Sequence, residues 1–353
     1  MKSAILIIGG AELGLHQIKA ARQAGFSVLV TDRNSGAPGL ALADSAGVID
    51  ATNHNELETF LSAHKSRYDI RGVYCGNDFG VRAVEHAKQL LDLPHNSFEA
   101  AARCTDKRLM KESFERAGIR SPRGYFAASA DARPKLPFPL IVKPVEGSGS
   151  RGISVVQNAT GWGAALTEAF AHTTTGVLVE EYLDGTHHDI NGFFFKNSFY
   201  PCGVMDRFFT PLPYCVPTKG YYPSSLTDGQ QAECYRLLEE AARALGITEG
   251  PVKGDLVKTG NTIYIYEASA RFHGDVSTSH LYSLRGEISP FERYFATLFA
   301  DCATPPGPGG AGVAAWYALP STKGFKDTTD IPGFVWFVGA TRAQTDRMFK
   351  ETL

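Results

Sequence analysis

The sequence predicts an α/β protein in which a domain built on a parallel sheet is followed by a larger α+β region of strand hairpins. Three observations lead to this prediction. Residues 1–95 alternate short apolar strands with helices, which is typical of a parallel sheet covered on both faces. Residues 139–156 form two strands around a glycine-rich loop. Residues 250–267 form a strand pair around the turn Thr259-Gly260-Asn261.

Composition excludes several classes of protein. The chain has 353 residues, of which 43% are hydrophobic and 20% are charged, so it is long enough for two or three globular domains. Lys and Arg (35) nearly balance Asp and Glu (37), which favours neither a nucleic-acid nor a membrane surface. The six cysteines are widely spaced without metal-type pairing, which indicates free thiols in a reducing compartment. No apolar run reaches the ~20 residues of a membrane span, so we expect a cytoplasmic protein.

The first domain opens with a β-α-β unit. A strand over Ala4–Ile8 leads through the turn Gly9–Gly14 into a helix that ends near Ala24, and a second strand at 27–31 ends at Asp32. We expect further strands at 47–49 and 73–75 and helices at 55–65 and 79–91, with Asn53 as a helix cap and a domain end near Pro94.

The ends of these parallel strands are candidate ligand positions. Ligands bind at the carboxyl ends of parallel strands, so Gly9–Gly14 and the pair Asn77 and Asp78 are predicted to form a substrate wall; a plain structural turn is the alternative. The spacing Gly-Gly-x-x-x-Gly differs from the Gly-x-Gly-x-x-Gly of dinucleotide sites. A nicotinamide oxidoreductase that uses Gly9–Gly14 and Asp32 is an alternative function. It would leave the motifs in the second half of the chain without a role.

Two lysines mark a candidate phosphate site. Lys107 lies in the first turn of a helix that ends at Gly118. Because the helix dipole disfavours a cation in the first turn, we interpret Lys107 as facing an anion; an ordinary surface lysine is the alternative. Lys143 ends the apolar strand 139–142 and precedes the loop Glu146–Gly152, before a second strand at 153–156. Bare backbone N–H groups in such a loop bind anions, so we interpret it as a phosphate clamp. The loop leads into a strand and lacks the Gly-Lys-Ser/Thr of a Walker loop; a glycine hairpin with an incidental lysine is the alternative.

The region after residue 176 is predicted to hold the second substrate. We expect a strand at 177–182, a hairpin of strands at 189–195 and 198–205, and a helix at 230–245. Residues 206–225 contain four prolines and several aromatic residues and are expected to be a loop that borders the acceptor substrate; a packed surface loop is the alternative. The candidate contacts are Tyr214, Lys219, Tyr221 and Tyr222, with Arg271 and His273 across the site.

Asp255 and Glu267 are predicted to lie on adjacent strands of the hairpin at 250–267. Two carboxylates ~4 Å apart repel by about 4 kcal/mol at an effective dielectric constant of 20. A divalent cation removes this repulsion, and Mg²⁺ accompanied by phosphates is the usual case. Two solvated acids at strand ends are the alternative.

Taken in order, these pieces resemble the ATP-grasp superfamily. The resemblance is carried by Asp106-Lys107, by Ile141-Val142-Lys143-Pro144 with its glycine loop, by Glu180-Glu181-Tyr182-Leu183-x-Gly185, and by Lys253-Gly-Asp255 with Glu267-Ala-Ser-Ala-Arg271. It implies a Rossmann-like pre-ATP-grasp domain (1–95), a two-subdomain α+β ATP-grasp fold made of a lid subdomain (96–176) and a metal-site subdomain (177–302), and a C-terminal segment (303–353). Because relatives often carry more sequence at this end, a truncated C-terminus is left open.

The resemblance also implies roles for individual residues. Lys107 and Lys143 would contact ATP phosphates, and the loop would close over them as a lid. Arg271 would steady the transferred phosphoryl group or a substrate carboxylate, with Lys253 as a second catalytic residue. The implied nucleotide contacts in the loop and beyond it are Gly147, Ser148, Gly149, Ser150, Gly152, Glu180, Glu181, Tyr182, Leu183 and His187, and the implied Mg²⁺ ligands are Asp255, Glu267 and Ser269.

Three positions depart from the family pattern. His187 stands where a ribose-binding glutamate is usual, and Ser269 stands where a metal-binding asparagine is usual. Lys253 occupies the place of a basic or imidazole residue. A catalytically silent nucleotide-binding protein is therefore a second alternative function.

Within the superfamily, the chain is most similar to carboxylate–amine ligases of the amino-acid or dipeptide type. The signs are Tyr222-Pro223-Ser224-Ser225, Leu245-Gly246-Ile247 and the run from Ala270 to Asp275. The resemblance implies ATP with two Mg²⁺ ions, an acyl phosphate intermediate, and release of ADP and phosphate. The expected partners are a small carboxylate and a small amine of unidentified structure, with no nucleic acid or membrane, and a homodimer is left open.

Overall fold

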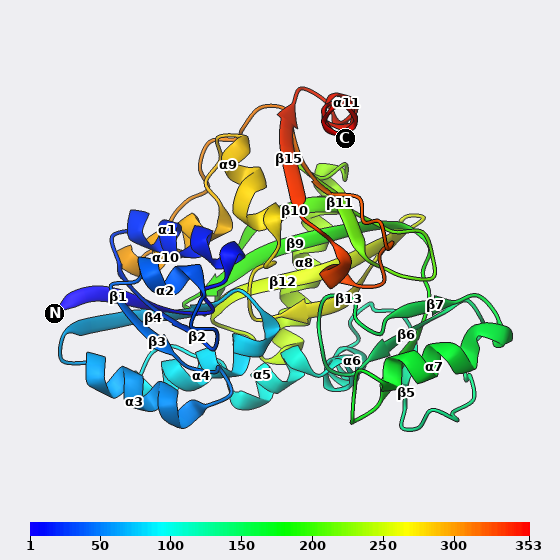
Figure 1. The fold of residues 1–353 in the computed structure, drawn as a ribbon, viewed down its shortest axis with the longest axis horizontal. Coiled ribbons are helices and arrows are strands. Elements are labelled where there is room, and N and C mark those ends of the chain that lie inside the picture. Colours follow the sequence, from blue (N-terminus) through cyan, green and yellow to red (C-terminus); the bar gives the residue numbers. More distant parts are fainter.

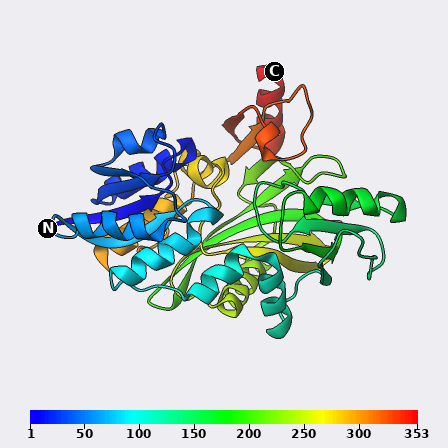
Figure 2. The same cartoon turned by 60° about the horizontal axis from the view of Figure 1, so that its bottom comes forward.

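The computed structural model describes all 353 residues and confirms the predicted α/β class. The fold has three parts: a parallel-sheet domain that includes the N-terminus, a small lid subdomain, and a long central sheet that continues to the C-terminus (Figure 1). Turning the molecule shows the lid subdomain and the N-terminal domain on opposite sides of the central sheet (Figure 2).

The N-terminal sheet contains four parallel strands in the order β3-β2-β1-β4. Residues of β1 alternate between the two faces: Ile5 and Ile7 pack in one apolar cluster, and Leu6 and Ile8 in another. The strands are β1 (Lys2–Ile8), β2 (Ser27–Asp32), β3 (Ser45–Val48) and β4 (Tyr68–Cys75), and the helices are α1 (Leu15–Gln23), α2 (Pro38–Leu42), α3 (His54–His64) and α4 (Val81–Leu90). The Asn53 side chain accepts the Glu56 N–H, which confirms the predicted cap of α3.

A late helix completes this domain. Phe291 and Phe295 of α10 (Pro290–Ala300) join Ile5 and Ile7 in the cluster on the α1 face of the sheet. The chain therefore returns to its first domain after the central sheet, which local sequence patterns do not reveal.

The lid subdomain is a four-stranded sheet in the order β5-β8-β6-β7 covered by α7 (Trp162–Phe170). Its strands are β5 (Gly124–Ala127), β6 (Leu140–Pro144), β7 (Ser154–Val156) and β8 (Val177–Glu181). The predicted hairpin is confirmed, because β6 and β7 pair antiparallel with Ile141 opposite Val155. The helices α5 (Phe98–Thr105) and α6 (Lys107–Arg116) precede this sheet, and the Asp106 side chain caps α6 by accepting the Leu109 N–H.

The central sheet has seven strands in the order β13-β12-β9-β10-β11-β14-β15, all paired antiparallel. The predicted hairpin of strands at 189–195 and 198–205 is confirmed: β9 and β10 pair antiparallel, and Lys196 and Asn197, which both have positive φ angles, form the turn between them. The strands are β9 (Thr186–Phe195), β10 (Ser198–Phe209), β11 (Pro217–Tyr222), β12 (Gly250–Thr259), β13 (Thr262–Ser269), β14 (Val313–Ala318) and β15 (Phe334–Gly339), and the helices are α8 (Asp228–Leu245), α9 (Tyr282–Leu284) and α11 (Arg342–Thr352).

The prediction of a continuous loop over 206–225 is wrong. Residues 206–209 extend β10, and Pro217–Tyr222 form β11 between β10 and β14. The reason is tertiary: β11 pairs with β14, nearly 100 residues later, and there Gly220 lies opposite Trp316. A side chain at Gly220 would clash with the Trp316 indole, 2.4 Å from its nearest atom, so glycine lets the aromatic ring lie across the strand.

No helix of the structure is both long enough and apolar enough to cross a membrane.

Candidate active site

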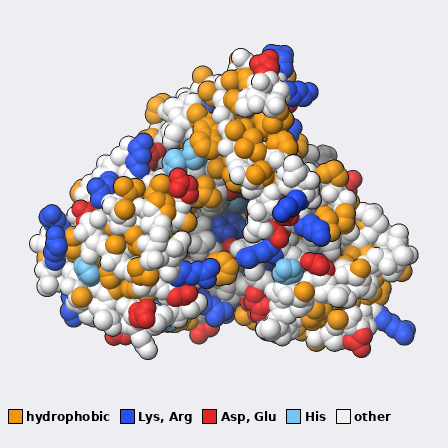
Figure 3. Space-filling view, viewed as in Figure 1, with side chains coloured by type: hydrophobic (Ala, Val, Ile, Leu, Met, Phe, Trp, Pro, Cys, Tyr) orange, Lys and Arg blue, Asp and Glu red, His pale blue; other side chains and the backbone are white.

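A cavity of about 1020 Å³ opens where the three parts meet. The space-filling view shows this hollow at the centre of the molecule, with Lys and Arg atoms at its floor and rim (Figure 3). The glycine loop, the β8 end, the β9–β10–β12–β13 face and the β4 end contribute to its wall. Eighteen of the predicted site residues line it: Asn77, Asp78, Lys107, Lys143, Gly147, Ser148, Gly149, Ser150, Glu180, Glu181, Tyr182, Leu183, His187, Lys253, Asp255, Glu267, Arg271 and His273.

Lysine side chains converge at one end of the cavity. Lys143 Nζ lies 2.6 Å from Glu180 Oε2, and Lys111 Nζ lies 3.2 Å from Glu180 Oε1. Lys107 Nζ donates to the Gly147 carbonyl oxygen at 2.8 Å. One buried carboxylate thus faces two buried ammonium groups, and a third ammonium group lies beside the glycine loop. This surplus of positive charge favours an anionic ligand.

The glycine loop is held in a conformation that glycine favours. Gly147, Gly149 and Gly152 have φ angles of +103°, +74° and +69°. A Cβ at Gly149 would also lie 2.5 Å from Thr328 Oγ1. Both conditions make Ala at position 149 a strained replacement.

Two segments that come later in the chain form hydrogen bonds with this loop. The N–H and the hydroxyl of Thr328 both donate to the Gly149 carbonyl oxygen, at 3.0 and 3.1 Å. Ser150 Oγ donates to the Cys215 carbonyl oxygen at 2.7 Å. The loop is therefore in contact with the C-terminal region as well as with its own subdomain.

The end of β8 forms a second wall of the cavity. Glu181 accepts two bonds from the Arg123 guanidinium, at 2.9 and 2.7 Å. The Glu180 carboxylate is occupied by Lys143 and Lys111, so its side chain is not free to meet an adenine edge in this arrangement. Burial, followed by the neighbouring His188, lowers the pKa of His187 to about 4. His187 therefore presents a neutral imidazole to the cavity.

Asp255 and Glu267 lie directly opposite each other on β12 and β13, as predicted. Lys253 Nζ lies between their carboxylates, 2.5 Å from Asp255 Oδ2 and 2.6 Å from Glu267 Oε1. Burial alone would lower the pKa of Lys253, but the two carboxylates raise it above its usual range. Two facing carboxylates fit a Mg²⁺ ion, which prefers oxygen ligands, although the ion would compete with this ammonium group.

Arg271 forms a buried ion pair with Asp78 at the end of β4. Its Nε and Nη2 atoms each lie 2.7 Å from an Asp78 oxygen, and Nη1 donates to the Phe272 carbonyl oxygen. Burial would raise the pKa of Asp78, but the Arg271 guanidinium holds it well below the usual range of an aspartate. Three of the five guanidinium N–H groups are used in this way, so two remain for a phosphoryl group or a substrate.

Six predicted site residues do not line the cavity. Ser269 is buried and donates its hydroxyl to Asp78 Oδ1 at 3.1 Å, and Gly152 lies against His172. The Tyr221 hydroxyl donates to Asp346 and the Tyr222 hydroxyl to Glu287, at 2.6 and 2.7 Å. The remaining two are Tyr214, whose carbonyl accepts the Thr210 hydroxyl, and Lys219, which pairs with Asp346. For Lys219, Tyr221 and Tyr222 the cause is the strand β11, which directs their side chains into contacts with α11 and with Glu287 near α9.

The glycine turn of the first domain also differs from its predicted place. Of Gly9–Gly14, only Leu13 lines the cavity. The Gly10 N–H donates to Asp32 Oδ2 at 2.7 Å, so the last residue of β2 bonds to the glycine turn of its own domain. This geometry gives no support to the nicotinamide oxidoreductase.

Several residues of the cavity wall were not predicted. Arg207 on β10 pairs with Asp189 on β9 and with Asp275. Asp206 on β10 accepts bonds from His188, Ser224 and Ser225 and pairs with Arg342 of α11 at 2.5 Å. The sequence signal that could have identified these residues is the presence of charged side chains inside the otherwise apolar strands 186–195 and 198–209. Charged side chains are buried only when they are paired.

Comparison with known proteins agrees with this geometry. Residues 136–279 match the family model described as "ATP-grasp domain". The chain contains an ATP-grasp domain. The predicted resemblance to the ATP-grasp superfamily is thereby confirmed for these residues, and the predicted fold class is confirmed.

Relatives and solved structures extend the comparison. A formate-dependent phosphoribosylglycinamide formyltransferase of Prochlorococcus marinus (strain MIT 9303) is 30% identical over 195 residues, which are 53% of this chain and 48% of that protein. This chain thus spans about half the length of the curated relatives that it matches first. The crystal structure of L-amino acid ligase from Bacillus licheniformis has a TM-score of 0.80 at 16% identity, covering 99% of this chain and 96% of that one. The crystal structure of N5-carboxyaminoimidazole synthetase from Staphylococcus aureus complexed with ADP also has a TM-score of 0.80 at 16% identity, and the match covers 99% of this chain and 96% of that one.

Proposed function

We propose that this protein is an ATP-dependent carboxylate–amine ligase that forms an amide bond through an acyl phosphate and releases ADP and phosphate. The observation that carries the proposal is that one cavity joins a lysine and glycine-loop clamp to a facing carboxylate pair. The named relatives support it, since formate and amino acids, which appear in their names, are carboxyl compounds.

The clamp residues would hold the triphosphate of ATP. Lys107 and Lys143 supply positive charge, and the loop Gly147–Gly152 supplies backbone N–H groups that a positive φ leaves accessible to phosphate oxygens. Mg²⁺, when bound by Asp255 and Glu267, would neutralise part of the phosphate charge. We place the adenine beside Tyr182 and Leu183, where the end of β8 lines the cavity.

The reaction needs positioning and charge neutralisation more than a protein nucleophile. The carboxylate oxygen of the first substrate attacks the γ-phosphorus, and ADP leaves; the amine nitrogen then attacks the acyl carbon, and phosphate leaves. Closure of the glycine loop would keep water away from the acyl phosphate. The other end of the cavity, near Arg207 and His273, is where we place the carboxylate and the amine.

A second candidate function is nucleotide binding without turnover. It is favoured by Lys253, whose ammonium group already neutralises the carboxylate pair without a metal ion. The two functions differ in whether any acid and amine pair increases ATP consumption.

The test is product analysis with amino acids supplied singly and in pairs. A ligase yields ADP and phosphate in a one-to-one ratio with the amide, and hydroxylamine traps the acyl phosphate as a hydroxamate when the acid alone is supplied. AMP and pyrophosphate as stoichiometric products would contradict the mechanism. Tight ATP binding with no turnover for any pair would favour the silent nucleotide-binding protein.

A further inference from the structure

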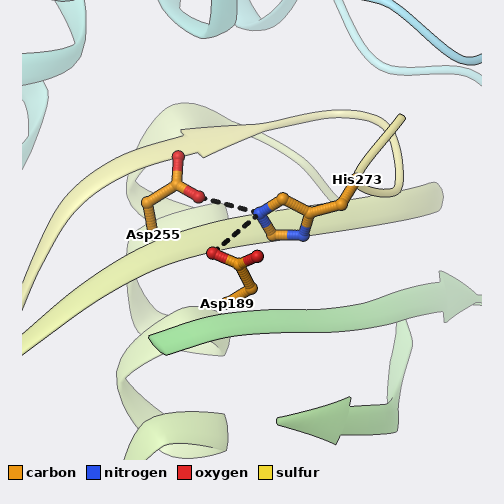
Figure 4. A group of neighbouring side chains, drawn as sticks. All are labelled: Asp189, Asp255 and His273. Carbon is orange, nitrogen blue, oxygen red and sulfur yellow. Dashed lines mark hydrogen bonds and ion pairs between the residues drawn. The ribbon is translucent and has the colours of Figure 1, made fainter. Parts of the chain in front are cut away.

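Beside the predicted magnesium pair, a second group of side chains points toward one spot (Figure 4). His273 Nε2 lies 2.7 Å from Asp255 Oδ1 and 3.7 Å from Asp189 Oδ1, and all three atoms lie within 4.8 Å of one another. Asp189 and Asp255 face each other on β9 and β12. Asp255 and His273 line the cavity, which gives the spot an entry path.

The other ring nitrogen of His273 has a fixed partner. His273 Nδ1 lies 3.1 Å from Asn191 Oδ1, and the same Asn191 atom accepts the His273 backbone N–H at 3.0 Å. An atom that accepts from a backbone N–H is the amide oxygen, so Nδ1 must be the nitrogen that donates. The histidine in a metal site donates its second N–H to a carbonyl in the same way, and this leaves Nε2 to bind the metal.

The two carboxylates are oriented in a comparable manner. Asp255 Oδ2 is held by Lys253 at 2.5 Å, and Asp189 Oδ2 is held by Arg207. Each carboxylate therefore keeps one oxygen, Oδ1, turned toward His273. Three ligand atoms whose residues are each fixed by a different protein group form a preorganised set.

Carboxylates outnumber the permanently charged cations that pair with them in this region. Asp189 is buried, whereas Asp255, Glu267 and Asp275 are partly exposed, and their ion-pair partners are Lys253, Arg207 and the imidazole of His273. Negative charges that are removed from water without compensation are costly, so a divalent ion fits the deficit.

We propose that Asp189, Asp255 and His273 bind a divalent first-row transition metal ion at a site separate from the magnesium pair Asp255 and Glu267. One imidazole nitrogen and two carboxylate oxygens suit Zn²⁺, Mn²⁺ or Fe²⁺ better than Mg²⁺, which prefers oxygen ligands alone. Asp255 would contribute a different oxygen to each site, Oδ1 here and Oδ2 toward Glu267, so the two ions would be neighbours.

The test measures metal binding without nucleotide, so that its outcome does not depend on ligase activity. Full-length protein is stripped with a chelator and titrated with Zn²⁺ or Mn²⁺ in the presence of excess Mg²⁺. We expect one ion per chain, and affinities at least ~100-fold weaker in the variants His273→Gln and Asp189→Asn, as loss of a ligand exceeds the 10- to 100-fold cost of losing an outer partner. Glu112→Gln is the matched control and should change the affinity less than ~3-fold, because Glu112 is exposed and pairs with Arg108 outside this charge network. Glu267→Gln tests whether the ion lies at the magnesium pair instead.

Folding and location are checked separately. Asp189→Asn disturbs the ion pair with Arg207, whereas His273→Gln leaves it intact, so agreement of the two variants excludes a folding defect as the cause. Anomalous scattering from a Zn²⁺-soaked crystal should place the ion within bonding distance of all three side chains. The proposal is overturned if wild-type protein binds no ion without ATP, if both variants bind as tightly as wild type, or if Glu267→Gln alone abolishes binding.

Discussion

The two ends of the cavity differ in how their charges are arranged. At the clamp, the buried carboxylate of Glu180 faces two ammonium groups, those of Lys111 and Lys143, and Lys107 lies beside the glycine loop; these groups come from α6, β6 and β8. On the central sheet, carboxylates outnumber cations, and the groups come from β9, β10, β12, β13 and α11. The clamp end is therefore suited to an anion and the sheet end to cations, which is the separation that a phosphate donor with metal ions requires.

The largest effect is expected from removing the central cation of the clamp. Lys143→Ala should reduce ATP binding or turnover at least ~100-fold, because the proposed main phosphate contact is lost. The measurement is steady-state ATP consumption together with nucleotide titration. Lys135→Ala is the matched control, since Lys135 is exposed and its ammonium group lies over the Tyr125 ring.

The loss could also arise because Lys143 neutralises Glu180, and a double variant separates this explanation from loss of the phosphate contact. Lys143 also neutralises buried Glu180, so Lys143→Ala leaves that carboxylate with Lys111 alone. The double variant Lys143→Ala, Glu180→Gln removes the uncompensated charge. If the double variant recovered ATP binding, Lys143 would serve only to balance Glu180, and the clamp assignment would be wrong.

The same contrast explains what the sequence could and could not predict. The clamp was visible because β6, the glycine loop and β7 are contiguous, and the pair Asp255 and Glu267 was visible because one hairpin carries both. By contrast, β11 lies between β10 and β14, and its partner β14 comes nearly 100 residues later, so the local pattern of 206–225 predicts a loop with its tyrosines as substrate contacts. The partners of Asp206 and Arg207 lie on other strands, in the segment after β13 and in α11, and no local pattern states which charges will meet.

A moderate effect is expected where the C-terminal region contacts the clamp. Thr328→Val removes one of the two bonds to the Gly149 carbonyl oxygen, so the loop should close less often and KM for ATP should rise about 3- to 10-fold, in line with a net hydrogen bond of about 1 kcal/mol. Thr328→Ser should restore the wild-type value, because it keeps the hydroxyl. Thr329→Val is the control, as that hydroxyl donates only to Asp327. An equal KM in Thr328→Val and wild type would show that the loop closes without this contact.

The smallest effect concerns a junction away from both ends of the cavity. The centroid of the His280 ring lies 3.9 Å from that of the Trp336 ring on β15 and 4.1 Å from that of the His16 ring on α1. His280 therefore contacts both the central sheet and the N-terminal domain. Burial, followed by the neighbouring His16, lowers the pKa of His280 to about 4. An unfolded histidine titrates near a pKa of about 6.5, so between these two values the unfolded chain binds more protons than the folded one.

The sign of the pH effect follows from this difference. The free energy of unfolding should fall as the pH drops from about 6.5 toward 4, and above that window the contribution of His280 should be fully present. Because the ring is only partly buried, we expect a loss of about 1 kcal/mol between pH 7 and pH 5 that His280→Phe, which keeps an aromatic ring against Trp336, does not show. Urea unfolding followed by tryptophan fluorescence at both pH values measures this. If the free energy of unfolding depended on pH in the same way in wild type and His280→Phe, protonation of His280 would not weaken the contact between the central sheet and the N-terminal domain.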